Sequence, residues 1–334
     1  MIDLIYLERE AIDHPRTQKI LNQYPRAEVV ECERYGELFN RSGQNFRLQK
    51  NRPALILAIK HGTKVLPAPQ EYSVGGKNNY YFSHMLNCLY DCRYCFLQGI
   101  YRSANYVLYV NYEEFFDSIR GLAASAPPGD ENWFFSGYDC DSLALEPLTG
   151  FVESVLPVFE ELPSNWLELR TKSTQIRSLL SREPLSNVVV AFSFTTEPAS
   201  RTLEHKVPNS ERRMDALAAL QRHGWPVALR FDPLIYHPNF KSEFAALCER
   251  IFSHLNSSLV HSVSVGGFRL PRDFYKRMRK LYPKEPLFIH CLEDNNGMVG
   301  YCAEIEADLL EAASNSIEQY VDKDSIYRIE EGAS

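Results

Sequence analysis

The sequence has no long apolar run and no recognisable secretory leader. None of its apolar stretches reaches the roughly 18 residues that a membrane-spanning helix needs. The opening residues, MIDLIYLEREAIDHP, turn acidic at the third position and contain no basic segment followed by an apolar one. We therefore expect a cytoplasmic protein with no membrane partner.

The chain also has no excess of basic residues, no internal repeat and no low-complexity tract. Its 334 residues include 36 Lys and Arg against 43 Asp and Glu, a formal charge of −7. A nucleic acid would therefore have to bind at a local basic patch. The hydrophobic content of 45% is enough for one large core, or for one core and a small additional domain, which excludes disorder as the main state.

Strand-like and helix-like segments alternate from about residue 79 onward. Apolar or aromatic runs predict six strands, at residues 79–85, 133–138, 166–171, 188–194, 227–236 and 260–268. Helical patterns lie at residues 112–124, 148–161, 175–181, 210–223, 243–255 and 272–281. This order predicts an α/β fold, which we expect to be a partial (β/α)6 barrel of parallel strands.

The first 75 residues have a different pattern and predict a small N-terminal α/β domain. It has strand candidates at residues 4–7 and 54–59 and a helix candidate near residues 16–23. Residues 67–77 contain two prolines and two glycines and are the expected linker. The predicted domains are therefore residues 1–75, a barrel at residues 76–300, and a C-terminal helical tail at residues 301–334.

Three of the eight cysteines fall in one C-x3-C-x2-C segment directly after the first predicted barrel strand: Cys88, Cys92 and Cys95. Three thiolates can hold three irons of a four-iron cluster and leave the fourth iron open to an external ligand. The alternative is a structural zinc site completed by His84 or by a distant cysteine. No second C-x2-C segment accompanies this one, which favours the cluster.

This loop resembles that of the radical S-adenosylmethionine superfamily, in which a C-x3-C-x-aromatic-C segment follows the first strand of a six-unit β/α domain. Tyr94 is the aromatic residue here. The resemblance implies a [4Fe-4S] cluster on the three cysteines. It also implies that the open iron binds the amino and carboxylate groups of S-adenosylmethionine, and that Tyr94 lies near the adenine.

From about residue 79 to 240 the chain is similar to the spore photoproduct lyase family. The likeness rests on YCFLQG, on a strand ending in Cys140 followed by Ser142, and on Thr171-Lys172-Ser173, Phe192-Ser193 and residues 233–237. It implies that Ser142, Lys172 and Ser193 contact the cofactor and that Cys140 donates a hydrogen atom to the product radical. These residues also fall at the carboxyl ends of predicted strands, where β/α domains place their active sites.

The family reaction implied by the resemblance is the reductive cleavage of S-adenosylmethionine. The resulting 5′-deoxyadenosyl radical reverses methylene-bridged thymine dimers in DNA. A flavodoxin or ferredoxin is the expected electron donor. In the helix predicted at residues 272–281, basic side chains on one side either bind phosphates or face water: Arg272, Lys276, Arg279 and Lys280.

The chain departs from the family pattern at Phe96, where the family has a tyrosine that takes part in the hydrogen relay. Tyr138 lies two residues before Cys140, on the same side of a predicted strand, and is a candidate substitute. The segment between Cys140 and Pro147 is also shorter, and residues 290–302 are less basic than the family suggests. The alternatives are a family member with another substrate and a zinc-stabilised nucleic-acid-binding module.

Overall fold

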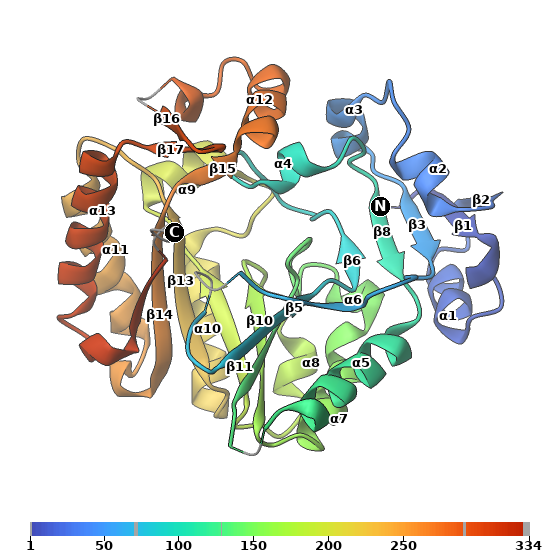
Figure 1. Cartoon of the computed structure of the whole chain (residues 1–334), viewed down its shortest axis with the longest axis horizontal. Coiled ribbons are helices and arrows are strands. Elements are labelled where there is room, and N and C mark those ends of the chain that lie inside the picture. The colour runs from blue at the N-terminus through green and yellow to red at the C-terminus, as the bar shows by residue number, and fades with distance from the viewer. Residues whose placement is uncertain (1, 70–72, 128, 290–291, 330–334) are drawn as a thin grey trace.

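The main part of the molecule is a curled eight-stranded sheet with the order β18-β14-β13-β11-β10-β9-β5-β4 (Figure 1). The computed structural model describes residues 2–69, 73–127, 129–289 and 292–329. Six neighbouring strands are parallel: β5 (Asn78–Phe82), β9 (Asn132–Ser136), β10 (Asn165–Thr171), β11 (Val188–Ser193), β13 (Val227–Leu234) and β14 (Val260–Gly267). The expected α/β fold with a curled parallel sheet is confirmed.

Two edge strands that the sequence did not predict complete this sheet. β4 (Val65–Pro67) is antiparallel to β5, and β18 (Ile326–Ile329) is parallel to β14. In the centre, every residue of β11 is buried, as its sequence VVVAFS suggests. A strand covered on both faces needs apolar, mostly β-branched side chains throughout.

Helices lie along the outer face of the sheet (Figure 1). α10 (Ser210–His223) begins after Asn209, whose side chain accepts a hydrogen bond from the Arg212 N–H, and ends at Gly224 with a φ of +107°. Ser210 is the first helical residue, as the sequence pattern at residues 210–223 predicts. The other helices here are α5 (Tyr112–Ser125), α6 (Glu146–Thr149), α7 (Phe151–Glu160), α8 (Arg177–Leu180), α9 (Glu197–Leu203), α11 (Phe240–His254) and α13 (Ala303–Ile317).

A second sheet lies at the right of Figure 1 and has the order β2-β1-β3-β8-β6, with β1, β2 and β3 in blue. It consists of β1 (Leu4–Glu8), β2 (Glu28–Cys32), β3 (Leu55–Ala58), β8 (Tyr106–Tyr109) and β6 (Met85–Leu86), together with α1 (Pro15–Gln23), α2 (Tyr35–Phe39) and α3 (Phe46–Asn51). β8 and β6 come from beyond residue 75. The strand predicted at residues 79–85 is therefore split, because β5 ends at Phe82 and Met85 begins β6 in the other sheet.

The remaining described elements belong to neither of these two sheets. They are β7 (Asp91–Cys92), α4 (Leu97–Ile100), β12 (Glu204–His205), β15 (Arg269–Pro271), α12 (Arg272–Leu281), β16 (Leu292–Asn295) and β17 (Met298–Tyr301), with short 3-10 helices η1 (Arg9–Ala11), η3 (Ser257–Leu259), η4 (Pro286–Phe288) and η5 (Lys323–Ser325). Of the predicted linker, residues 70–72 lie outside the described residues, as do residues 290–291 and the last five residues of the predicted tail. No described helix has the length and apolarity to cross a membrane.

Candidate active site

The cysteine loop lies between β6 and α4. The Cys95 N–H donates to the Cys92 carbonyl at 3.1 Å, and the Tyr90 N–H donates to Cys88 Sγ at 3.4 Å. Cys92 belongs to β7, which pairs with β12 so that Cys92 lies opposite Glu204. Backbone pairing therefore fixes the loop from a segment more than 100 residues further along the chain.

All three thiols of this loop are free and line one cavity of about 620 Å³. Burial raises the pKa of each thiol, that of Cys88 to about 12, while the positive charges of Lys50 and Lys172 partly oppose this for Cys95. A metal ligated here would displace the thiol protons, because thiolates are the ligands.

The same cavity brings together most of the residues that the sequence singled out. Besides the three cysteines, its wall contains Tyr94, Tyr138, Cys140, Lys172 and Ser193. The last four come from the ends of β9, β10 and β11 or from the residues just after them. The carboxyl ends of parallel strands meet at one edge of a sheet, which is why residues so distant in sequence converge.

Cys140 is a buried thiol, 8% exposed. Burial first, and then the negative charges of Cys88, Asp139 and Asp141, raise its pKa well above the usual value. Cys140 therefore keeps its S–H at neutral pH. A protonated thiol in contact with a cavity can donate a hydrogen atom.

Tyr138 lies at the cavity wall and is 40% exposed. Its ring centroid is 4.3 Å from that of Tyr81 and 5.3 Å from that of Phe96. Phe96, the residue that departs from the family pattern, therefore lies beside Tyr138, the tyrosine that the sequence analysis named as its candidate substitute.

Tyr94 is 5% exposed and donates a hydrogen bond to the Glu204 carboxylate. The other oxygen of Glu204 accepts from Arg213 at 2.7 Å, and Arg213 also donates to the Ser193 carbonyl at 2.8 Å. Burial alone would raise the pKa of Glu204, but Arg213 and Lys172 lower it. Sequence reasoning missed Glu204 and Arg213, because nothing in a single sequence pairs a helix residue with a cluster loop.

Ser142 does not line the cavity. It is 1% exposed, and its Oγ is 2.7 Å from Ser136 Oγ and donates to the Ser136 carbonyl at 3.1 Å. Ser136, at the end of β9, lines the cavity instead. Gly137 allows this turn: its φ is +75°, and a Cβ there would lie 2.6 Å from Ser142 Oγ.

Asp141 is a further wall residue that the sequence analysis missed. One carboxylate oxygen accepts from Thr171 Oγ1 at 2.7 Å and from the Leu143 and Ala144 N–H groups; the other accepts from the Lys172 N–H at 2.7 Å. It ties the end of β9 to the end of β10. This carboxylate therefore positions the backbone on both sides of Cys140 and Lys172.

A network of ion pairs begins at one residue of the cavity wall. Arg170 lines the cavity and donates to Glu168 at 2.9 Å, and Glu168 also accepts from the fully buried Arg230 at 2.7 Å. Burial opposes ionisation, but the two guanidinium groups lower the pKa of Glu168 to about 2. Glu168 therefore stays ionised and keeps Arg170 in place.

His84 does not face the cavity. It is 2% exposed, its ring is stacked on Phe151 with centroids 3.9 Å apart, and burial lowers its pKa to about 3. It is a neutral core residue. His84 is therefore not available as the fourth ligand of the alternative zinc site.

The basic helix α12 packs against α4 beside the cavity, and Phe274 contributes to the wall (Figure 1). Arg272 pairs with Asp294. Lys276, Arg279 and Lys280 are exposed. The expected basic patch thus lies next to the residues discussed above, with one of its four cations already paired.

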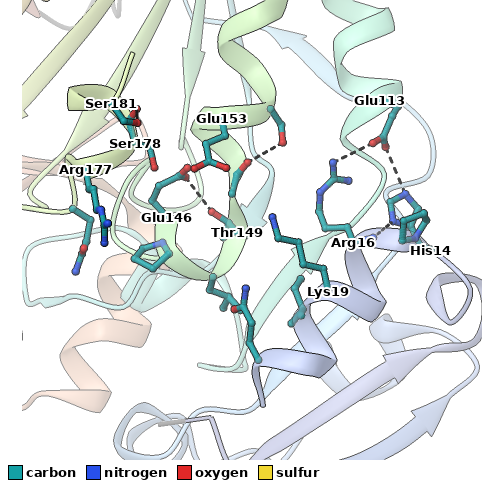
Figure 2. Close-up of a pocket in the computed structure, with 18 residues that line it drawn as sticks. His14, Arg16, Lys19, Glu113, Glu146, Thr149, Glu153, Arg177, Ser178 and Ser181 are labelled. Carbon is teal, nitrogen blue, oxygen red and sulfur yellow. Dashed lines mark hydrogen bonds and ion pairs between the residues drawn. The ribbon is translucent and has the colours of Figure 1, made fainter. Parts of the chain in front are cut away.

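A second, larger cavity of about 1130 Å³ lies between α1 and the segments around α6 and α8. Figure 2 shows that Arg16 and His14 pair with Glu113, and that Thr149 donates a hydrogen bond to Glu146. The Glu146 carboxylate also accepts from the Val152 N–H at the start of α7. None of the predicted site residues lines this cavity.

The fold and the first cavity define a class: an α/β protein with a three-cysteine loop and a separate thiol at the carboxyl edge of a curled parallel sheet. A sequence model of the family described as spore photoproduct lyase matches residues 1–298. The chain therefore belongs to the spore photoproduct lyase family, and it is a radical S-adenosylmethionine lyase.

Solved structures of spore photoproduct lyase have the same fold. One variant of that enzyme, another with bound AdoMet and dinucleoside spore photoproduct, and a complex with dinucleoside spore photoproduct each align with a TM-score of 0.85 at 16% identity. Each alignment covers 99% of this chain and 98%, 99% and 98% of those chains, respectively. No curated protein sequence matches the chain.

Proposed function

We propose that this protein reverses methylene-bridged thymine dimers in DNA, with a [4Fe-4S] cluster and S-adenosylmethionine in the 620 Å³ cavity. The observation that carries the proposal is that the three thiols of the cysteine loop and the protonated thiol of Cys140 line one cavity. Membership of the family and the fold shared with enzymes that bind the lesion support the choice of substrate.

Cys88, Cys92 and Cys95 would hold the cluster. The chemistry of the donors fits: they are three soft thiolates in one loop. In a four-iron cluster each of these thiolates would bind its own iron and leave the fourth iron open to an external ligand.

S-adenosylmethionine would lie against Tyr94, Lys172 and Ser193. Glu204 and Arg213 hold the Tyr94 hydroxyl and the backbone of Ser193, so the two walls are fixed relative to each other. Lys172 adds a positive charge 5.5 Å from the Tyr94 ring and can bind a carboxylate. Ser136 replaces Ser142 as the serine that can reach the ligand.

When bound, the cluster and S-adenosylmethionine would supply a 5′-deoxyadenosyl radical that removes a hydrogen atom from the methylene-bridged thymine dimer. After the bridge breaks, the Cys140 S–H donates its hydrogen atom to the thymine radical, which becomes a normal thymine and leaves a thiyl radical. Tyr138 would then donate its O–H hydrogen atom to the Cys140 thiyl radical, the step for which Phe96 has no hydroxyl, and would become a tyrosyl radical. A flavodoxin or ferredoxin would deliver the electron, and exposed cations of α12 would contact DNA phosphates.

A family member that acts on another substrate is the second candidate. Phe96 favours it, because a changed hydrogen relay beside Cys140 is expected to accompany changed chemistry. The two candidates share the cluster and the cofactor but differ in what accepts the radical.

Anaerobic incubation tests the proposal. The protein with its reconstituted cluster is mixed with S-adenosylmethionine, dithionite and an oligonucleotide that carries one spore photoproduct, and the products are read by mass spectrometry. Two restored adjacent thymines would support the assignment. Formation of 5′-deoxyadenosine with an intact lesion would reject the substrate and leave the second candidate.

A further inference from the structure

Lys50 reaches the cysteine loop from outside the main sheet. It lies in the last turn of α3, in the N-terminal unit, and is only 6% exposed. Its Nζ donates to the Cys88 carbonyl at 2.9 Å and to the Tyr90 carbonyl at 2.9 Å. A long flexible side chain therefore ends at a fixed point under the loop.

No carboxylate neutralises this ammonium group. Among residues 2–69, 73–127, 129–289 and 292–329, no carboxylate oxygen lies within 4.0 Å of Lys50 Nζ, whereas Lys64 of the same unit pairs with Glu114 at 2.6 Å. Two carbonyl oxygens satisfy the N–H groups but leave the charge uncompensated. A buried, uncompensated charge is unfavourable, so a negative partner is expected at this place.

The cysteines of the loop would provide the matching charge once they bind the cluster as thiolates. Burial raises the pKa of Cys88, and the positive charge of Lys50 acts against this. The charge of Lys50 acts in the same direction on Cys95. Lys50 is thus electrostatically coupled to two of the three thiols that would bind the cluster.

Neighbouring contacts keep Lys50 from moving away. The carbonyl of Lys50 accepts a hydrogen bond from Lys206 Nζ at 2.6 Å, and Lys206 follows β12. The adjacent Gln49 side chain accepts from the Ala104 N–H at 3.0 Å, just before β8. The backbone around Lys50 is therefore held on two sides, by Lys206 after β12 and by the segment just before β8.

We propose that Lys50 is a positioning residue that balances the negative charge of the cluster thiolates and makes the cluster easier to reduce. The inference rests on the proposed function, because it requires a cluster on these cysteines. Reduction adds one electron to the cluster, and a fixed cation nearby stabilises the reduced form more than the oxidised form. The N-terminal unit would then set the reduction potential of a site that the main sheet binds.

The test uses the full chain with reconstituted cluster, without DNA. Lys50→Gln keeps an N–H donor and loses the charge, Lys50→Arg keeps the charge, and Lys64→Gln is the matched control. Iron and sulfide contents are measured first, and a redox titration is then followed by electron paramagnetic resonance. We expect Lys50→Gln to lower the ratio of reduced to oxidised cluster at a fixed potential by about tenfold, which is about 59 mV for one electron.

Lys50→Arg and Lys64→Gln should titrate close to the wild type. A wild-type midpoint in a fully loaded Lys50→Gln protein would overturn the inference. Should Lys50→Gln fail to load, Lys50→Met takes its place in the titration. If both neutral variants fail to load while Lys50→Arg loads, charge balance is supported; if Lys50→Arg also fails, the inference is wrong. A wild-type protein that binds no iron and sulfide rejects the proposed function instead.

Discussion

The two cavities of this molecule differ in how their polar groups are satisfied. In the larger one, of about 1130 Å³, Arg16 pairs with Glu113, and Glu146 accepts from the start of α7. In the smaller one, of about 620 Å³, the thiols face the space with no covalent partner. Size therefore does not mark the reactive site. What distinguishes the proposed reactive site is that its thiols have no covalently bonded partner in the described part of the protein. Four measurements test this difference between the two cavities.

The largest effect is expected from a ligand of the cluster. Cys92→Ala removes one of three thiolates, and we expect more than about 100-fold loss of 5′-deoxyadenosine formation, since even partners of ligands contribute 10–100-fold to metal affinity. Iron and sulfide analysis with liquid chromatography checks this. Cys32→Ala, outside both cavities, is the control and should retain its iron. Normal iron content and turnover in Cys92→Ala would refute the assignment of the loop.

The next effect separates radical formation from repair. Cys140→Ala should still produce 5′-deoxyadenosine but lower the yield of restored thymine at least about tenfold, a change of about 1.4 kcal/mol in the partition of the product radical. Mass spectrometry of the oligonucleotide measures both. Cys248→Ala, another buried thiol but one in α11, should repair normally. Equal repair by both variants would remove Cys140 from the mechanism.

A smaller effect is expected at Tyr138. Tyr138→Phe keeps the ring that packs on Tyr81 and Phe96 and loses only the hydroxyl, so repair should continue while the number of repairs per S-adenosylmethionine consumed falls several-fold. The control is Tyr80→Phe, whose ring packs on Phe134. The ratio of restored thymine to 5′-deoxyadenosine is the measurement. An unchanged ratio would show that the relay uses another group.

The smallest effect on catalysis is expected in the larger cavity, at Glu146. Burial raises its pKa in the folded state from 4.5 to about 7. The folded state therefore holds this proton more strongly than the unfolded state, and the resulting stability, present below pH 4.5, is lost as the pH rises to 7. Glu146→Gln has no such loss.

The difference in unfolding free energy between Glu146→Gln and the wild type should therefore grow in favour of the variant by about 3 kcal/mol between pH 4.5 and 7.5. Urea unfolding at several pH values measures it, with the repair assay as a parallel readout. A loss of repair at constant stability would show that this cavity takes part in the reaction.

The main elements could be predicted because their signals are local. The continuous apolar run of β11 and the capping residues of α10 identify these elements within a few residues, and the three loop cysteines identify themselves by spacing. Several residues of the cavity wall could also be predicted from the sequence, because the carboxyl ends of the strands meet at one edge of any parallel sheet.

The rest depends on contacts between distant residues. The pairing of Cys92 with Glu204, the bond from Lys50 and the position of Ser136 rather than Ser142 on the cavity wall each need the register of a strand or the path of a turn. Gly137 decides the last of these through a φ of +75°, which no alternation of polar and apolar residues reports.

The path of the chain through β6 and β8 has a consequence for synthesis. These strands pair with each other in the N-terminal sheet, and the segment between them carries the cysteine loop. This sheet cannot close until Tyr109 has left the ribosome, and β12 emerges about 100 residues later. At a translation rate of ~5–20 residues per second, the cysteine loop is synthesised roughly 5–20 seconds before β12, the strand that pairs with β7. Iron loading is therefore expected to follow the synthesis of β12.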